Sequence, residues 1–120
     1  MVKISLRALK TAEQQDKKRR DTEWANKVKD LDGWTCCICG AKFRVFAHHI
    51  INRENLMYKY DIDNGITLCL KHHKFDRTIS AHNAPFAFLL WLKKYKFHKY
   101  DLARERIVQT LLGDIDLNGV

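Results

Sequence analysis

Soft metal ligands occur in this chain as two short pairs with the same spacing. Cys36 and Cys39 form a Cys-x-x-Cys pair, and Cys69 and His72 form a Cys-x-x-His pair. A structural zinc ion takes four such ligands in a tetrahedron, and a tight turn brings residues with this spacing onto one ion. We therefore predict a structural zinc site made of these four side chains. Cys37 lies between two of the ligands and is expected to point away from the ion.

Three further histidines flank the predicted zinc site and are left for other chemistry. His73 follows His72 directly, and His48 and His49 precede a polar loop. Adjacent helical residues are rotated by about 100° around the axis, so His73 is expected to face away from the zinc ion and toward the segment that ends at His48 and His49. Neighbours in an ideal strand face opposite sides, so these two histidines address one site only where the strand twists or ends. The pattern predicts a second site beside the zinc site.

The elements that must hold these residues are short and of mixed type. Residues 11–31 contain no Pro or Gly and are rich in helix formers, which predicts a helix that stops at Asp32-Gly33. Trp24, Val28 and Leu31 give its second half a face to bury. The other expected elements are a strand at 43–47, an irregular loop at 51–64, a strand at 66–68, and helices at 71–79, from Asn83-Ala84-Pro85 onward and at 101–112.

The overall charge of the chain is strongly positive. It has 22 Lys and Arg residues against 14 Asp and Glu, a net charge of +8 and a pI near 9.5. This balance favours a polyanionic partner, nucleic acid before an anionic membrane surface, although a merely solvated basic surface would give the same numbers. No run of about 18 apolar residues is present, so no membrane-spanning helix is expected. The first residues lack the pattern of a secretion signal, so we expect a cytoplasmic protein whose cysteines do not form disulfides.

The order of these motifs resembles that of the HNH nuclease family, which has a ββα-metal (His-Me finger) fold. The segments that carry the resemblance are Cys-x-x-Cys at 36–39, Ala-His-His-Ile at 47–50, and Asp-Asn-Gly-Ile-Thr-Leu-Cys-x-x-His-His at 63–73. The run-in from Trp24 to Cys36 is also similar to small bacterial and phage members. The resemblance covers about residues 24–79. It implies a zinc-bound ββα-metal core at 33–80. The length and the helical patterns add the rest of one α+β domain over 1–120, namely a basic N-terminal helix at 1–32 and helices at 81–120 that lie outside the resemblance.

The resemblance also implies a role for each residue of the second site. His49 matches the general base, and His48 matches a metal ligand that is Asp in many relatives. His73 matches the final metal-binding histidine, and Asn64 matches the residue that steadies the loop and orients the base. Arg77 stands where some relatives place a further metal-binding histidine. Two protein ligands are therefore expected, with water and phosphate oxygens completing the shell.

The activity implied by the resemblance is metal-dependent hydrolysis of phosphodiester bonds in DNA. A histidine with a pKa near 6.5 is mostly neutral at pH 7, so His49 could take a proton from water. Mg²⁺ or Mn²⁺ is expected at His48 and His73, and two imidazoles also tolerate Ni²⁺, Co²⁺ or Zn²⁺. Candidate phosphate contacts, each of which could instead be a solvated charge, are Arg53, Lys59, Lys74, Arg77, Lys17, Lys18, Arg19 and Arg20.

Other interpretations of the same residues remain open at this point. A zinc-stapled module that binds nucleic acid without catalysis explains the charge and the zinc ligands, but it gives the histidines of the second site no task. A thiol redox protein built on Cys36 and Cys39 is disfavoured, because no βαβ pattern surrounds the pair. Cysteines buried as small apolar side chains would need no metal at all.

Overall fold

The computed structural model describes residues 5–114 of the 120-residue chain. In chain order the elements are α1 (Leu6–Leu31), β1 (Val45–His49), the 3₁₀ helix η1 (Ile62–Asn64), β2 (Gly65–Cys69), the π-helix η2 (Lys71–Phe75), α2 (Pro85–Tyr95) and α3 (Phe97–Asp114). The two strands pair as an antiparallel hairpin. The predicted α+β class is therefore confirmed.

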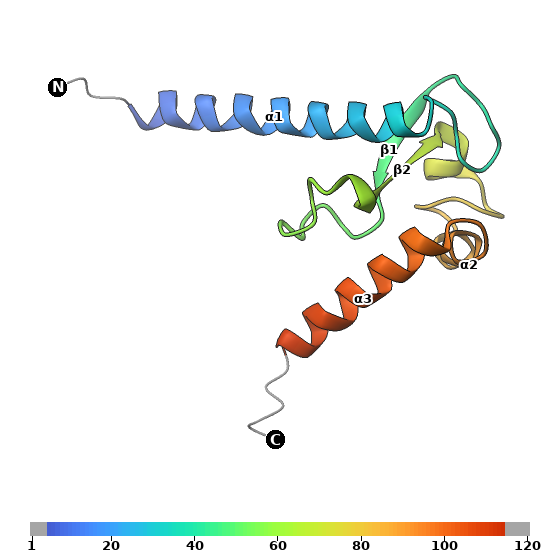
Figure 1. Cartoon of the computed structure of the whole chain (residues 1–120). Helices are drawn as coiled ribbons and strands as arrows, with labels where there is room; N and C mark the ends of the chain where they lie inside the picture. Colours follow the sequence, from blue (N-terminus) through green and yellow to red (C-terminus); the bar gives the residue numbers. More distant parts are fainter. Residues whose placement is uncertain (1–4, 115–120) are drawn as a thin grey trace.

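Helix α1 is longer than the sequence pattern indicates, because it begins at Leu6 instead of near residue 11. Ser5 caps it by accepting a hydrogen bond from the Ala8 amide at 3.1 Å, and no Gly or Pro interrupts the turns that follow. Within α1 only Trp24 and Val28 are buried, so the predicted buried face was wrong for Leu31, which is 72% exposed. The first half of α1 extends well past the hairpin, whereas its last turns lie against it (Figure 1).

The β1–β2 hairpin carries both histidines of the Ala-His-His-Ile motif at one end. Its register pairs His48 with Ile66 and His49 with Gly65. Strand β1 starts two residues later than predicted, because Arg44 has a left-handed backbone (φ 51°) that an extended strand does not allow. Both histidines therefore belong to the strand and point to opposite faces of the hairpin.

The two faces of the hairpin pack against different helices. A methyl group built on Gly65 would come within 2.4 Å of Val28 and 2.9 Å of Trp24, so α1 lies directly on that face. On the other face Ile66 shares a core with Phe88 of α2. Within residues 5–114 the buried cluster consists of Cys36, Ile66, Leu68, Cys69, Phe88 and Leu92. Two predicted zinc ligands thus belong to the core.

The segment after β2 differs from the predicted helix at 71–79. The helix η2 ends at Phe75, because Asp76 is extended and its carboxylate accepts hydrogen bonds from the Thr78 and Ile79 amides at 2.7 and 2.9 Å. Ala81 and His82 then pair back onto η2 through their backbones. Helix α2 starts at Pro85 as predicted, but Asn83 does not cap it, because its side chain bonds to Phe75 instead. Helix α3 starts at Phe97, four residues before the predicted start.

Candidate functional site

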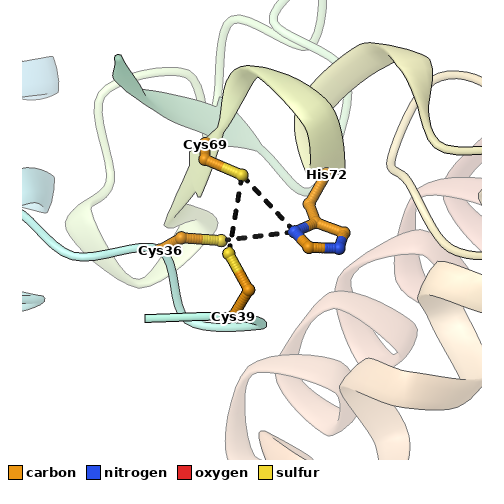
Figure 2. Close-up of side chains that lie close together, drawn as sticks. All are labelled: Cys36, Cys39, Cys69 and His72. Carbon is orange, nitrogen blue, oxygen red and sulfur yellow. Dashed lines mark hydrogen bonds between the residues drawn. The ribbon is translucent and has the colours of Figure 1, made fainter. Parts of the chain in front are cut away.

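The four predicted zinc ligands come together from three parts of the chain (Figure 2). The sulfur atoms of Cys39 and Cys69 are 3.7 Å apart, and Nδ1 of His72 lies 3.4 Å from Cys69 Sγ and 3.8 Å from Cys36 Sγ. A tetrahedral zinc ion with bonds of about 2.3 Å to sulfur and about 2.0 Å to nitrogen needs edges of roughly 3.8 and 3.5 Å. The sulfur separation is far above the ~2.05 Å of a disulfide. The set could therefore bind a metal such as zinc, as predicted.

The turn that carries the first two ligands shapes their chemistry. This turn, residues 36–40, is called the knuckle below. The Gly40 amide donates to the Cys36 carbonyl at 2.9 Å, and the left-handed backbone of Gly40 (φ 78°) closes the turn. Burial alone would raise the pKa of the Cys36 thiol, but hydrogen bonds from the Cys69 amide and from amides of the knuckle outweigh burial and lower this pKa. A thiol that ionises more readily suits a metal ligand.

Cys37 stands outside the metal-binding set, as its position in the sequence indicates. Its amide donates to the Thr67 carbonyl at 3.0 Å, which attaches the knuckle to β2. Burial, reinforced by the nearby Asp32 carboxylate, raises the pKa of the Cys37 thiol to about 11. The thiol is therefore protonated at neutral pH, and it packs against the core.

A second group of potential metal ligands lies beside the first and contains three histidines. His48 comes from β1, His73 from η2, and His82 from the turn before α2, and each offers one nitrogen within 4.8 Å of the other two. The Nε2 atoms of His73 and His82 are 3.2 Å apart. Cis ligands around an ion with M–N bonds of about 2.1 Å are roughly 3.0 to 3.4 Å apart, so this separation fits a shared cation.

His82 was not expected from the sequence, which indicated two protein ligands. The His82 amide donates to the His73 carbonyl at 3.0 Å, and the Ala81 amide donates to the His72 carbonyl at 2.9 Å. This backbone pairing folds the chain back so that a residue nine positions later lies next to His73. Arg77 is exposed instead, in the turn between the two segments. The only hint in the sequence is a histidine a short distance after a break in the helical pattern.

The electrostatic environment of this group disfavours protons on two of its rings. Burial, together with the neighbouring His73 and His82, lowers the pKa of His48 to about 3. Burial, His82 and Lys74 lower the pKa of His73 to about 4. Both imidazoles are therefore neutral at pH 7, the form in which histidine binds metals. Nδ1 of His73 is buried and has no hydrogen-bond partner among the described residues.

His49 lies on the opposite face of the hairpin and is held in a defined orientation. Its Nε2 is 2.9 Å from the Lys59 carbonyl oxygen. A carbonyl only accepts hydrogen bonds, so Nε2 carries the proton and Nδ1 of the neutral ring keeps a free lone pair. The ring also stacks on Trp24. Burial lowers the pKa of His49, so the ring is neutral at pH 7 and able to accept a proton.

Asn64 steadies the loop that supplies the Lys59 carbonyl. Its Oδ1 accepts from the Ile51 amide at 2.7 Å, and its Nδ2 donates to the carbonyls of Ile51 at 3.1 Å and Tyr58 at 3.2 Å. Asn64 is only 2% exposed. The side chain thus ties the beginning of the loop to the part next to Lys59, whose carbonyl contacts His49.

One cleft of about 620 Å³ joins His49 to the three-histidine group. Arg53 and Lys74 line the same cleft and place positive charge at its edge. Glu54 lines it as well, which the sequence did not indicate. The cleft therefore combines potential metal ligands, a neutral histidine outside the ligand group and cationic side chains.

Several of the other candidate phosphate contacts form ion pairs with acidic side chains of α1. Lys59 is 6% exposed and its ammonium lies 3.3 Å from Asp21, so the structure argues against a contact to phosphate. Lys17 also pairs with Asp21, at 3.3 Å, and Arg19 pairs with Asp16 at 2.7 Å.

The remaining candidates of the basic helix differ from these. The guanidinium of Arg20 lies 4.2 Å from the centre of the Tyr60 ring, whereas Lys18 is fully on the exposed side of α1. The ion pairs of Lys17 and Arg19 with acidic residues offset part of the positive charge of α1. Of the candidate phosphate contacts, Arg53 and Lys74 line the cleft.

No protein-family model, no curated protein and no solved structure matches this chain. The resemblance to HNH nucleases therefore rests on the residue pattern alone. None of the described helices is long and apolar enough to cross a membrane.

Proposed function

We propose that the protein is a metal-dependent DNA endonuclease of the HNH type with a structural zinc ion. The observation that carries this proposal is that His49 and three imidazoles that could hold a cation line one cleft. Hydrolysis of a phosphodiester bond needs a base that takes a proton from water and a positive charge at the phosphate. Strand β1 supplies His48 and His49 and η2 supplies His73, which is the family's order, whereas His82 comes from the turn before α2.

Different side chains of the cleft would take the proton, bind the phosphate and hold the metal ion. Nδ1 of His49 accepts the proton of the attacking water, while the Lys59 carbonyl retains the proton on Nε2. Arg53 and Lys74 bind phosphate oxygens of the DNA backbone. A divalent ion bound by the three histidines would supply Lewis acidity toward the scissile phosphate and stabilise the charge on the 3′ leaving oxygen. Asn64 maintains the loop on which the orientation of His49 depends.

The ligand set favours some divalent ions over others. Three imidazoles replace the two expected from the sequence, and nitrogen ligands suit Mn²⁺, Co²⁺, Ni²⁺ and Zn²⁺ better than Mg²⁺, which prefers oxygen and retains its water. We therefore place Mn²⁺ and the later transition metals before Mg²⁺ as activating ions. Zinc is assigned to the separate group of Cys36, Cys39, Cys69 and His72.

The proposed substrate is DNA, bound through its backbone. The net charge of +8 and the two cationic residues of the cleft favour contacts that depend on salt and tolerate different sequences. A zinc-stapled module that binds DNA without cleaving it accounts for the same charge. It does not account for a neutral, oriented His49 next to three converging imidazoles.

A plasmid-cleavage assay separates the two functions. The protein is first treated with a mild chelator, its zinc content is measured so that one zinc per chain is retained, and Mn²⁺, Ni²⁺ or Mg²⁺ is then added. The nuclease proposal predicts relaxed or linear DNA only after an ion is added, with Mn²⁺ or Ni²⁺ more effective than Mg²⁺. Binding of the plasmid without cleavage under every ion would favour the module instead.

A further inference from the structure

Trp24 of α1 lies flat against the imidazole of His49. The centres of the two rings are 3.8 Å apart and their planes differ by 5°. Trp24 is 4% exposed, and it reaches this position from a helix outside the segment that contains the histidines. A parallel stack at this distance covers one whole face of the imidazole.

The surrounding chain is built so that the indole can lie in this position. The Trp24 Nε1–H donates to the Asp61 carbonyl at 2.8 Å, which fixes the ring in its plane. Gly65 is the residue paired with His49 across the hairpin. A Cβ atom there would come within 2.9 Å of the indole and 2.4 Å of Val28. The absence of a side chain at Gly65 therefore leaves the space above the hairpin to Trp24.

We infer that Trp24 is a positioning residue for His49, with its indole face setting the plane of the imidazole. This inference rests on the proposed function, since it assigns a task to the residue that orients the base. The Lys59 carbonyl selects the nitrogen that carries the proton, but one hydrogen bond leaves the ring free to tilt about it. The indole removes this freedom, because a tilt of the imidazole would collide with its surface. The two contacts together direct Nδ1.

A core tryptophan without this task would depend on other properties of the side chain. A core position needs apolar bulk, whereas a positioning role needs a flat face. Trp24→Phe keeps a flat ring but loses the hydrogen bond to Asp61. Trp24→Leu keeps apolar bulk and loses the flat face. Val28→Ala serves as the matched control, since Val28 is also buried in α1 and packs on Gly65 but has no flat ring to stack on His49.

The orientation of His49 can be measured without any nuclease activity. Long-range proton–nitrogen correlation spectra of the zinc-loaded protein report which ring nitrogen carries the proton, and ring-current shifts report the stacked indole. We expect a single Nε2–H form with upfield-shifted ring protons in the unaltered protein, in Trp24→Phe and in Val28→Ala. In Trp24→Leu we expect both tautomers and loss of the upfield shift. Ordinary shifts for His49 in the unaltered protein would overturn the inference.

Cleavage kinetics test what the orientation does. A reacting group displaced by about 1 Å can lose on the order of 10²-fold in rate, so Trp24→Leu should lower kcat by about that factor while KM changes little. Trp24→Phe and Val28→Ala should stay within several-fold of the unaltered protein. A kcat of Trp24→Leu equal to that of Val28→Ala would overturn the inference, as would equal losses in the Phe and Leu variants. Trp24→Met replaces Trp24→Leu if the latter does not bind zinc.

The spectra and the cleavage kinetics together distinguish failure of this inference from failure of the proposed function. If the unaltered protein cleaves no DNA with any ion, the proposed function fails, and the spectra still decide whether Trp24 orients His49. If the protein cleaves DNA but the spectra and rates do not respond to Trp24→Leu, the positioning role alone fails.

Discussion

Replacing Asn64 by alanine should destabilise the protein strongly, because it removes three hydrogen bonds at once. Two of these bonds go to Ile51 and one goes to Tyr58, at 2.7, 3.1 and 3.2 Å. Each lost bond costs about 1 kcal/mol, and the Ile51 amide left unpaired in a buried position adds about 1–3 kcal/mol. The expected loss is therefore about 4–6 kcal/mol. That is a large part of the roughly 5–15 kcal/mol that stabilises an average domain.

Thermal unfolding followed by circular dichroism measures this loss, with Asn52→Ala as the matched control. Asn52 lies in the same loop, and its side chain accepts one exposed bond, from the Glu54 amide at 3.0 Å. At about 4 °C per kcal/mol, Asn64→Ala should melt some 15–25 °C lower, whereas Asn52→Ala should change the melting temperature by a few degrees at most. Equal shifts in the two variants would refute the role of Asn64 as the residue that closes the loop.

Three further predictions concern the metal sites. His82→Ala should weaken binding of Mn²⁺ or Ni²⁺ about 10- to 100-fold by calorimetry, and Arg77→Ala should not; equal affinities would remove His82 from the ligand set. Cys39→Ser should lose zinc and cooperative unfolding, and retention of one zinc per chain would contradict the four-ligand site. Burial lowers the pKa of His48 to about 3 and that of His73 to about 4, so the unfolded chain takes up protons at a higher pH than the folded chain does. Without added ion, the free energy of unfolding should therefore fall as the pH drops from about 6.5 toward 4, less steeply in His48→Leu. An identical slope in that variant would show that His48 does not contribute.

Features that depend on local spacing could be predicted from the sequence. The end of α1 at Asp32-Gly33 follows from local backbone preferences. The helical spacing also predicted the burial of Trp24 and Val28, but it was wrong for Leu31, which is exposed. The zinc group was also predictable, because each ligand pair lies within a single turn. His72 and His73 belong to different groups of potential metal ligands, as expected for side chains at adjacent positions in η2.

Features that depend on contacts between distant segments could not be predicted in this way. His82 approaches His73 only because the backbone pairs after the turn at Asp76, and no periodic pattern marks that pairing. Lys59 has the charge of a surface residue, but it is buried against Asp21, which comes from α1. The stack of Trp24 on His49 likewise depends on how α1 crosses the hairpin.

In the proposed reaction His49 takes the proton from water during metal-dependent cleavage of DNA. The most direct measurement compares the plasmid-cleavage rates of His49→Ala and His98→Ala in the presence of Mn²⁺. His98 is an exposed histidine of α3 that does not line the cleft. Loss of a general base costs about 10²- to 10⁴-fold, so His49→Ala should be slower by that factor while zinc content and cooperative unfolding are retained, and His98→Ala should be fully active. Equal rates in the two variants would show that His49 is not the general base.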